Sequence, residues 1–81
     1  MKQITMLLME FDRSKRVFSA LREISLPSVP NKGDRIALEV DGNGYMFNVY
    51  DVHYGEAGID VNIVRIATFT DFYGSGFPDI Q

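Results

Sequence analysis

The chain has 81 residues, no cysteine and a formal net charge of −3, and 46% of its residues are hydrophobic. This length fits one small domain, and the hydrophobic fraction is too high for a disordered segment. The lack of cysteine excludes disulfides and thiolate zinc sites, and no apolar run reaches the roughly 20 residues of a membrane span. We therefore expect a soluble cytoplasmic domain, and a homodimer is one way in which so short a chain could gain stability.

Charge is divided unevenly along the chain. Residues 1–32 carry six basic and three acidic side chains, whereas residues 33–81 carry two basic and eight acidic ones. An acidic surface repels phosphate groups, so the overall balance disfavours nucleic acid as a partner. The first half nevertheless contains one basic cluster, formed by Arg13, Lys15, Arg16 and Arg22.

Alternation of apolar and polar residues with a period of two predicts β-strands along most of the chain. The first strand, Gln3 to Phe11, is apolar on both faces, which suits a strand buried on both sides or at a subunit interface. A polar turn follows at residues 12–15. Residues 16–26 fit two structures: a strand that returns along the first as a hairpin, which we favour, or a short helix within about residues 12–25 that ends before Pro27.

The stretch from Leu26 to Asp34, LPSVPNKGD, is expected to form a corner that delivers the chain into the next strand. Its two prolines cannot donate backbone hydrogen bonds, so it cannot lie inside a sheet. Pro30 and Asn31 suit the centre of a turn, and Gly33 can adopt a positive φ at its exit. A half-buried strand with clean alternation follows, from Arg35 to Asp41.

Two hairpins are predicted in the second half of the chain. The first turn lies at Asp41-Gly42-Asn43-Gly44, and the second at Gly55-Glu56-Ala57-Gly58. The apolar face changes midway along the strand Tyr45–Tyr54 and again along the strand Ile59–Ile66, which predicts a bulge or sharp bend in each. Matching changes of face in adjacent strands indicate a coiled, barrel-like sheet.

Five strands in a meander-like order, with a turn-rich crossing near the middle, predict an all-β fold, a small SH3-like or OB-like barrel over residues 1–67. Residues 68–81, rich in aromatic residues and glycine, would form a C-terminal arm or tail. The segment Leu26–Ile66 contains Leu-Pro, then Pro-x-x-Gly-Asp before the alternating strand, and later Phe47, Val49, Val52 and His53. It resembles small uncharacterised bacterial and phage proteins that have Tyr-x-Val-x-x-Val-x-His in this later part, and this chain departs slightly from that motif because Tyr45 and Phe47 share the aromatic role. The resemblance implies a small β-barrel and brings no activity with it.

Candidate catalytic and metal-binding groups are sparse. His53 is the only histidine, with Asp51 two residues away to tune its pKa, and no cysteine or evident serine nucleophile accompanies the pair. Asp41-x-Asn43 resembles the start of a calcium loop, but Tyr45 occupies the third ligand position and a hairpin turn explains the same residues. A cation could also lie among His53, Asp51 and Asp60 across the last hairpin. We predict no catalytic residues, no metal and no cofactor.

The aromatic side chains of the second half are the better candidates for binding. Most should lie in the core of so small a domain, but on a curved sheet they could stack on bases or line a peptide groove. The preferred hypothesis is a non-enzymatic interaction module that binds a protein partner or itself. The alternative is a single-stranded nucleic-acid-binding domain that uses the basic cluster. The candidate binding residues are Tyr45, Phe47, Tyr50, Tyr54 and Tyr73.

Overall fold

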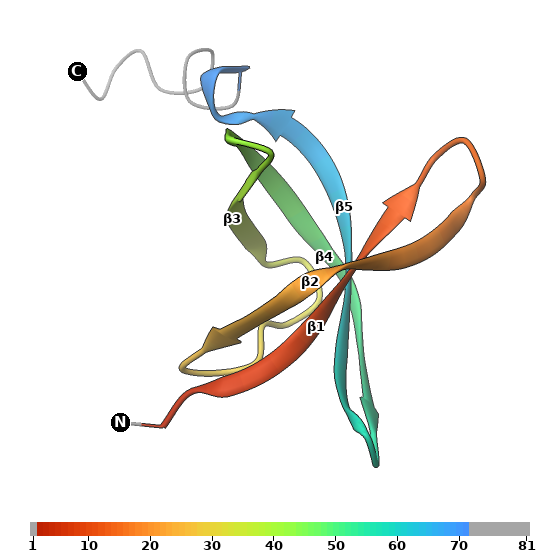
Figure 1. The fold of residues 1–81 in the computed structure, drawn as a ribbon, viewed down its shortest axis with the longest axis vertical. Coiled ribbons are helices and arrows are strands. Elements are labelled where there is room, and N and C mark those ends of the chain that lie inside the picture. The colour runs from red at the N-terminus through yellow and green to blue at the C-terminus, as the bar shows by residue number, and fades with distance from the viewer. Residues whose placement is uncertain (1, 72–81) are drawn as a thin grey trace.

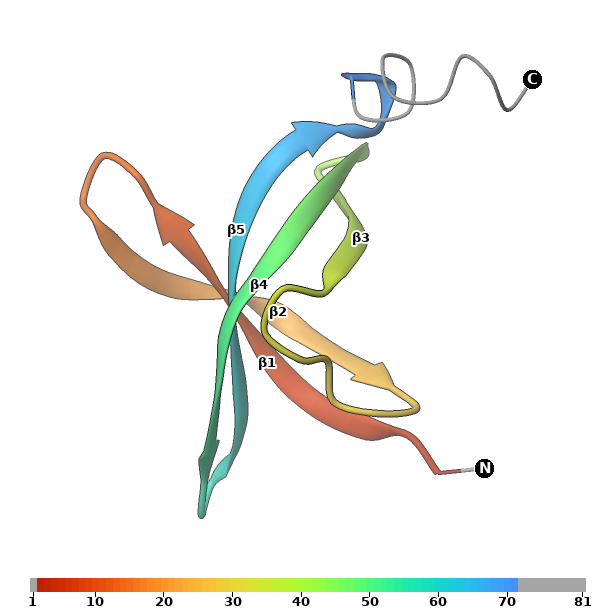
Figure 2. The ribbon, with the colours of Figure 1, turned by 180° about the vertical axis from the view of Figure 1, so that it is seen from behind.

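A computed structural model describes residues 2–71, which form a five-stranded mixed sheet curled into a half-barrel (Figures 1 and 2). The predicted all-β fold is confirmed, and residues 17–26 adopt the strand rather than the short helix, with Arg16 in the turn before it. The only helical turn among the described residues lies at 69–71. None of these residues belongs to a helix with the length and hydropathy needed to cross a membrane. The strands are β1 (Ile4–Asp12), β2 (Val17–Leu26), β3 (Arg35–Val40), β4 (Asn43–Gly55) and β5 (Gly58–Thr68).

The predicted domain boundary near residue 67 falls one residue before the end of β5. Thr68, assigned in the sequence to the C-terminal arm, is the last residue of that strand. The remaining residues of the arm, 72–81, lie outside the described part of the chain.

The strand order is β2-β1-β5-β4-β3, so the expected crossing near the middle lies between β2 and β3, which are on opposite edges of the sheet. β2 does not pair with β3. Instead β1 pairs in parallel with β5, with Leu7–Glu10 alongside Asp60–Ile63. A strand that is apolar on both faces is stable at the centre of a sheet, and β1 takes that place between β2 and β5. β2 and β3 remain as the two edges of the half-barrel.

The polar turn between β1 and β2 is built around Asp12. Its Oδ1 accepts hydrogen bonds from the Ser14 amide at 2.9 Å, the Ser14 hydroxyl at 2.8 Å and the Lys15 amide at 3.1 Å. Arg16 closes the turn with a φ of 59°, and its amide donates to the Asp12 carbonyl. The hydrogen bond from the Ser14 hydroxyl, followed by that from the Lys15 amide, lowers the pKa of Asp12 below its ordinary value of 3.8.

The corner before β3 has the conformation that its residues predict. The Asn31 amide donates to Asp34 Oδ2 at 2.8 Å, the Asp34 amide donates back to the Asn31 carbonyl at 2.9 Å, and Gly33 has a φ of 93°. Two further backbone hydrogen bonds join Gly33 and Asp34 to Val49 of β4. The corner is therefore hydrogen-bonded to the sheet, and these bonds fix where β3 begins.

Both predicted hairpins are present, as are the changes of face. Asp41 and Gly42, with φ of 54° and 83°, form a two-residue turn of the primed type between β3 and β4. Glu56 and Ala57 form the turn between β4 and β5. The ladder between these strands shifts register near Tyr50 and near Ile66, where one strand carries an extra residue. The bulge at Tyr50 explains the break in alternation along β4. The break along β5 falls between Ile63 and Val64, before the shift at Ile66, because this part of β5 has apolar residues on both faces.

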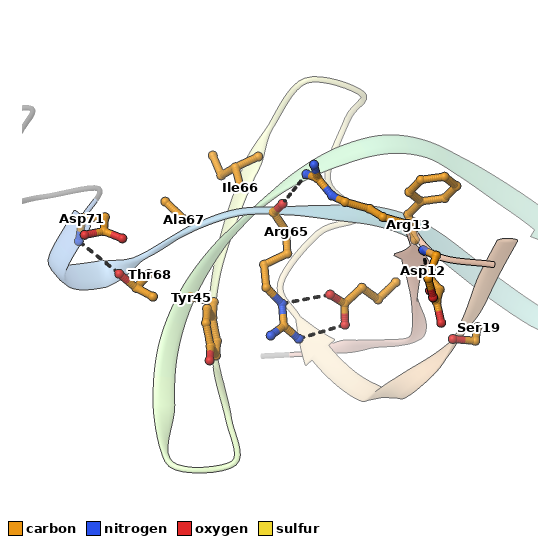
Figure 3. Close-up of a pocket in the computed structure, with 12 residues that line it drawn as sticks. Asp12, Arg13, Ser19, Tyr45, Arg65, Ile66, Ala67, Thr68 and Asp71 are labelled. Carbon is orange, nitrogen blue, oxygen red and sulfur yellow. Dashed lines mark hydrogen bonds and ion pairs between the residues drawn. The ribbon is translucent and has the colours of Figure 1, made fainter. Parts of the chain in front are cut away.

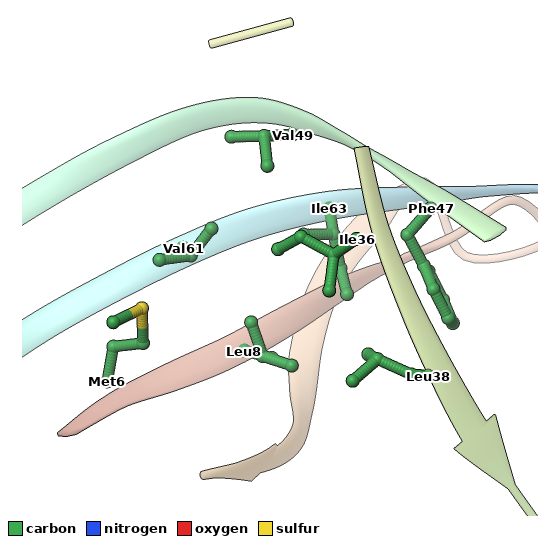
Figure 4. Close-up of a cluster of buried hydrophobic side chains, with 8 residues drawn as sticks. All are labelled: Met6, Leu8, Ile36, Leu38, Phe47, Val49, Val61 and Ile63. Carbon is green, nitrogen blue, oxygen red and sulfur yellow. The ribbon is translucent and has the colours of Figure 1, made fainter. Parts of the chain in front are cut away.

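The hydrophobic core occupies the inner face of the curled sheet (Figure 4). β2 adds partly buried Leu21, Ile24 and Leu26. Arg22, also on β2, donates from Nη1 to the Glu39 carbonyl of β3 at 3.0 Å and so spans the open side between the two edges. The buried cluster consists of Met6, Leu8, Ile36, Leu38, Phe47, Val49, Val61 and Ile63.

The contact between Gly44 and Phe69 provides a test of how the end of β5 packs. A Cβ atom at Gly44 would overlap the Phe69 ring, so we expect Gly44→Ala to displace the ring and lower the free energy of unfolding by about 1–3 kcal/mol. At Gly55 a Cβ would meet only the Gly58 carbonyl at 3.7 Å, an ordinary contact, so Gly55→Ala serves as the control. Urea denaturation measures both. Equal stability of the two variants would contradict the packing.

Acid titration tests the Asp12 turn. The lowered pKa means that the folded state favours the carboxylate, so this stabilisation is fully present above pH 3.8 and is lost as the pH falls through the folded-state pKa. We expect the stability difference between the wild type and Asp12→Asn to be largest near neutral pH and to shrink below 3.8. Urea midpoints measured across this range check it, and a pH-independent difference would contradict it.

Candidate interaction surface on the outer face

The five aromatic residues predicted for binding do not form one surface. Phe47 is completely buried in the core, as most aromatics of a small domain must be, and so it cannot contact a ligand at the surface. Tyr45 is partly buried beneath Arg65 on the inner side. Tyr54 is 72% exposed near the far end of the β4–β5 hairpin, and Tyr73 lies outside the described residues. Tyr50 alone lies on the outer face, with 54% of its surface exposed.

Tyr50 belongs to a different aromatic group, which we call the outer patch: Phe11, Phe18, Tyr50 and Val64. Phe11 and Phe18 lie opposite each other in the β1–β2 hairpin, with ring centroids 5.2 Å apart. The Phe18 ring is 5.7 Å from that of Tyr50, so the hairpin of β1 and β2 contacts the bulge in β4. Together with Arg13, these four side chains line an open hollow of about 400 Å³. Apolar surface is thus left open to solvent on the side of the sheet away from the core.

Two cations border the outer patch. Arg13 lines its hollow, and its Nη2 is held by a hydrogen bond of 3.0 Å to the Arg65 carbonyl. Lys32 Nζ lies 6.0 Å from the centroid of the Tyr50 ring, within the range of a cation–π interaction. The predicted basic cluster is therefore only partly assembled here. Lys15 and Arg16 are exposed in the adjoining turn, but Arg22 lies at the open side of the half-barrel.

Sequence reasoning missed Phe11, Phe18 and Lys32 as members of a surface site. The signal for the two phenylalanines was available: pairing Asp12 with Val17 across the turn places Phe11 opposite Phe18. No comparable signal links Lys32 to Tyr50, because that contact depends on the backbone hydrogen bonds between the corner before β3 and Val49 of β4.

A second hollow, of about 750 Å³, surrounds an ion pair between Arg65 and Glu10 (Figure 3). Arg65 Nε lies 2.8 Å from Glu10 Oε2, and Nη2 donates to Oε1 at 2.9 Å. The guanidinium carbon also lies 4.2 Å from the centroid of Tyr45 and 5.3 Å from that of Phe47. These contacts join β1, β4 and β5. Since they already engage the guanidinium, its role is structural.

The predicted His53–Asp51 contact is present. His53 Nε2 lies 3.3 Å from Asp51 Oδ1, and the Asn62 side chain donates to the same oxygen at 2.6 Å. Asp60 lies opposite His53 in the β4–β5 ladder. Within residues 2–71, however, no group of three or more histidine, cysteine or carboxylate side chains is arranged to hold a metal ion.

Comparison of the chain with family models, curated proteins and solved structures gives no match. The resemblance of Leu26–Ile66 to small bacterial and phage proteins therefore stays a prediction. The functional case rests on the geometry of the outer patch.

The Arg65 contacts predict a difference between arginine and lysine at this position. Arg65→Lys keeps the charge but cannot contact both carboxylate oxygens of Glu10 or place a guanidinium beside the Tyr45 ring. We therefore expect the free energy of unfolding to fall by about 1–2 kcal/mol. Arg16→Lys, the same replacement at an exposed turn residue, should change it by less than about 0.5 kcal/mol. Chemical denaturation measures both, and indistinguishable variants would refute the structural role of Arg65.

Proposed function

We propose that this domain is a non-enzymatic interaction module that binds a protein partner through the outer patch. The observation that carries the proposal is the meeting of three aromatic rings from three strands on the face away from the core. Their hollow is apolar and bordered by cations. Such a surface suits a partner that inserts an apolar side chain and carries acidic groups beside it.

The charge of the chain favours protein over nucleic acid as that partner. Eight acidic side chains in residues 33–81 and a net charge of −3 repel a phosphate backbone over most of the molecule. A folded protein or peptide can place its few acidic groups near Arg13 and Lys32 and leave the acidic remainder of the surface uncontacted.

Single-stranded nucleic acid is the second candidate, and one observation favours it. Arg13 and Lys32 adjoin exposed aromatic rings, and such rings with neighbouring cations stack bases and hold phosphates in single-strand binders.

Replacement of Tyr50 tests the proposal. We expect Tyr50→Ala to reduce the amount of partner retained from a cell lysate by at least about tenfold, because it removes the most exposed ring of the patch. Tyr54→Ala is the matched control, since it removes an exposed tyrosine at the far end of the β4–β5 hairpin. Quantitative mass spectrometry of proteins retained by each immobilised variant gives the readout, and unfolding curves verify that both variants fold. Equal retention by the two variants would refute the proposal.

A titration with single-stranded DNA tests the second candidate function. Fluorescence anisotropy of a labelled oligothymidine at low salt should show no binding at micromolar protein concentration. Binding that is lost in Tyr50→Ala and at high salt would instead assign the patch to nucleic acid.

A further inference from the structure

The two edges of the sheet differ in how they are covered. β3 has six residues, its Glu39 carbonyl is occupied by Arg22, and the corner before it is bonded to β4. β2 has ten residues, and within residues 2–71 its backbone pairs only with β1. The other side of β2 therefore presents a row of backbone donors and acceptors, which is a template for a further strand.

Residues 17–20 of β2 lack the features that commonly protect an edge, namely charged side chains, prolines and bulges. No lysine or proline occurs between Val17 and Leu26, and Val17 is 51% exposed. The register shift in the β1–β2 ladder leaves Leu21 as an extra residue, so residues 17–20 form a regular segment before it. Phe18 of the outer patch lies in this segment. The open edge and the patch therefore meet at Phe18.

Charge distinguishes the two ends of this edge. Arg13, Lys15 and Arg16 gather in the turn that leads into Val17, whereas Glu23 lies toward the other end. An approaching strand with acidic side chains is attracted to the Val17 end, where Phe18 and the hollow also lie.

We propose that the open edge of β2 takes up an extended acidic segment of a protein partner as an additional strand, with an apolar side chain of that segment against Phe18. This inference rests on the proposed function and specifies the kind of partner. Backbone hydrogen bonds to the edge would supply affinity, while the outer patch and the neighbouring cations would select the sequence.

A second copy of this chain is the less suitable occupant. Residues 17–26 contain one acidic and one basic side chain, so a second copy of β2 has no acidic excess to place beside Arg13, Lys15 and Arg16. An acidic segment from another protein supplies that excess.

The test uses a fluorescent peptide of alternating valine and glutamate with the ten-residue length of β2. Its affinity for the full chain is measured by anisotropy, beside a peptide in which lysine replaces glutamate. We expect the glutamate peptide to bind at least about tenfold more tightly. Lys15→Glu should weaken its binding, whereas Lys2→Glu, the same charge reversal near the Leu26 end of β2, should leave it unchanged.

Two backbone-methylated versions of the peptide test strand addition itself. N-methylation of alternate residues blocks the hydrogen bonds along one side of the peptide and keeps all its side chains. We expect one methylation pattern to abolish binding and the complementary pattern to preserve it. Equal affinity for the two methylated peptides would overturn the inference, and so would equal affinity for the glutamate and lysine peptides. A chain that is dimeric by light scattering, and that the peptide does not dissociate, would overturn it as well. Tyr50-dependent retention of a partner without peptide binding would overturn this inference alone and leave the proposed function standing.

Discussion

Four residue pairs of parallel β-structure hold this domain together. Within residues 2–71, Leu7–Glu10 of β1 and Asp60–Ile63 of β5 provide the only ladder between the β1–β2 hairpin and the three strands β3, β4 and β5. The ladder places Leu8 beside Val61, so that the apolar residues of the two parts become one buried cluster. Its last pair includes Glu10, which is also the partner of Arg65. Because this pairing joins segments far apart in sequence, closing it costs more chain entropy than closing either of the short hairpins.

Local elements were predictable because their signals are local. Alternation assigned the strands, Asp41-Gly42 marked a primed turn, and the break in alternation along β4 marked the bulge near Tyr50. The pairing of β1 with β5 was missed because a period of two reports which face of a strand is buried and says nothing about its neighbour. The one usable hint was that β1 is apolar on both faces, which fits a central strand better than the edge of a meander.

The candidate surface was harder to predict than the fold. Aromatic composition pointed to the second half of the chain, yet Phe47 fills the core and only Tyr50 of the named tyrosines belongs to the outer patch. The other two rings come from the first strands, where sequence reasoning treated them as ordinary apolar positions. The basic residues predicted to cluster do not all lie together. The extra residue at Leu21 changes the face of the residues that follow it, so Arg22 points toward Glu39 and away from Arg13.

The β4–β5 hairpin has a practical consequence for work on this domain. β3 pairs with only residues 43–48 of β4, and β1 pairs with only residues 60–63 of β5, so toward the tip of the hairpin, within the described part of the chain, each strand forms its ladder with the other alone. Their tip, Glu56 and Ala57, is exposed. A dye or epitope introduced between these two residues would extend a ladder that already ends in solvent. It would mark the molecule for imaging or capture without touching the core, the outer patch or the open edge.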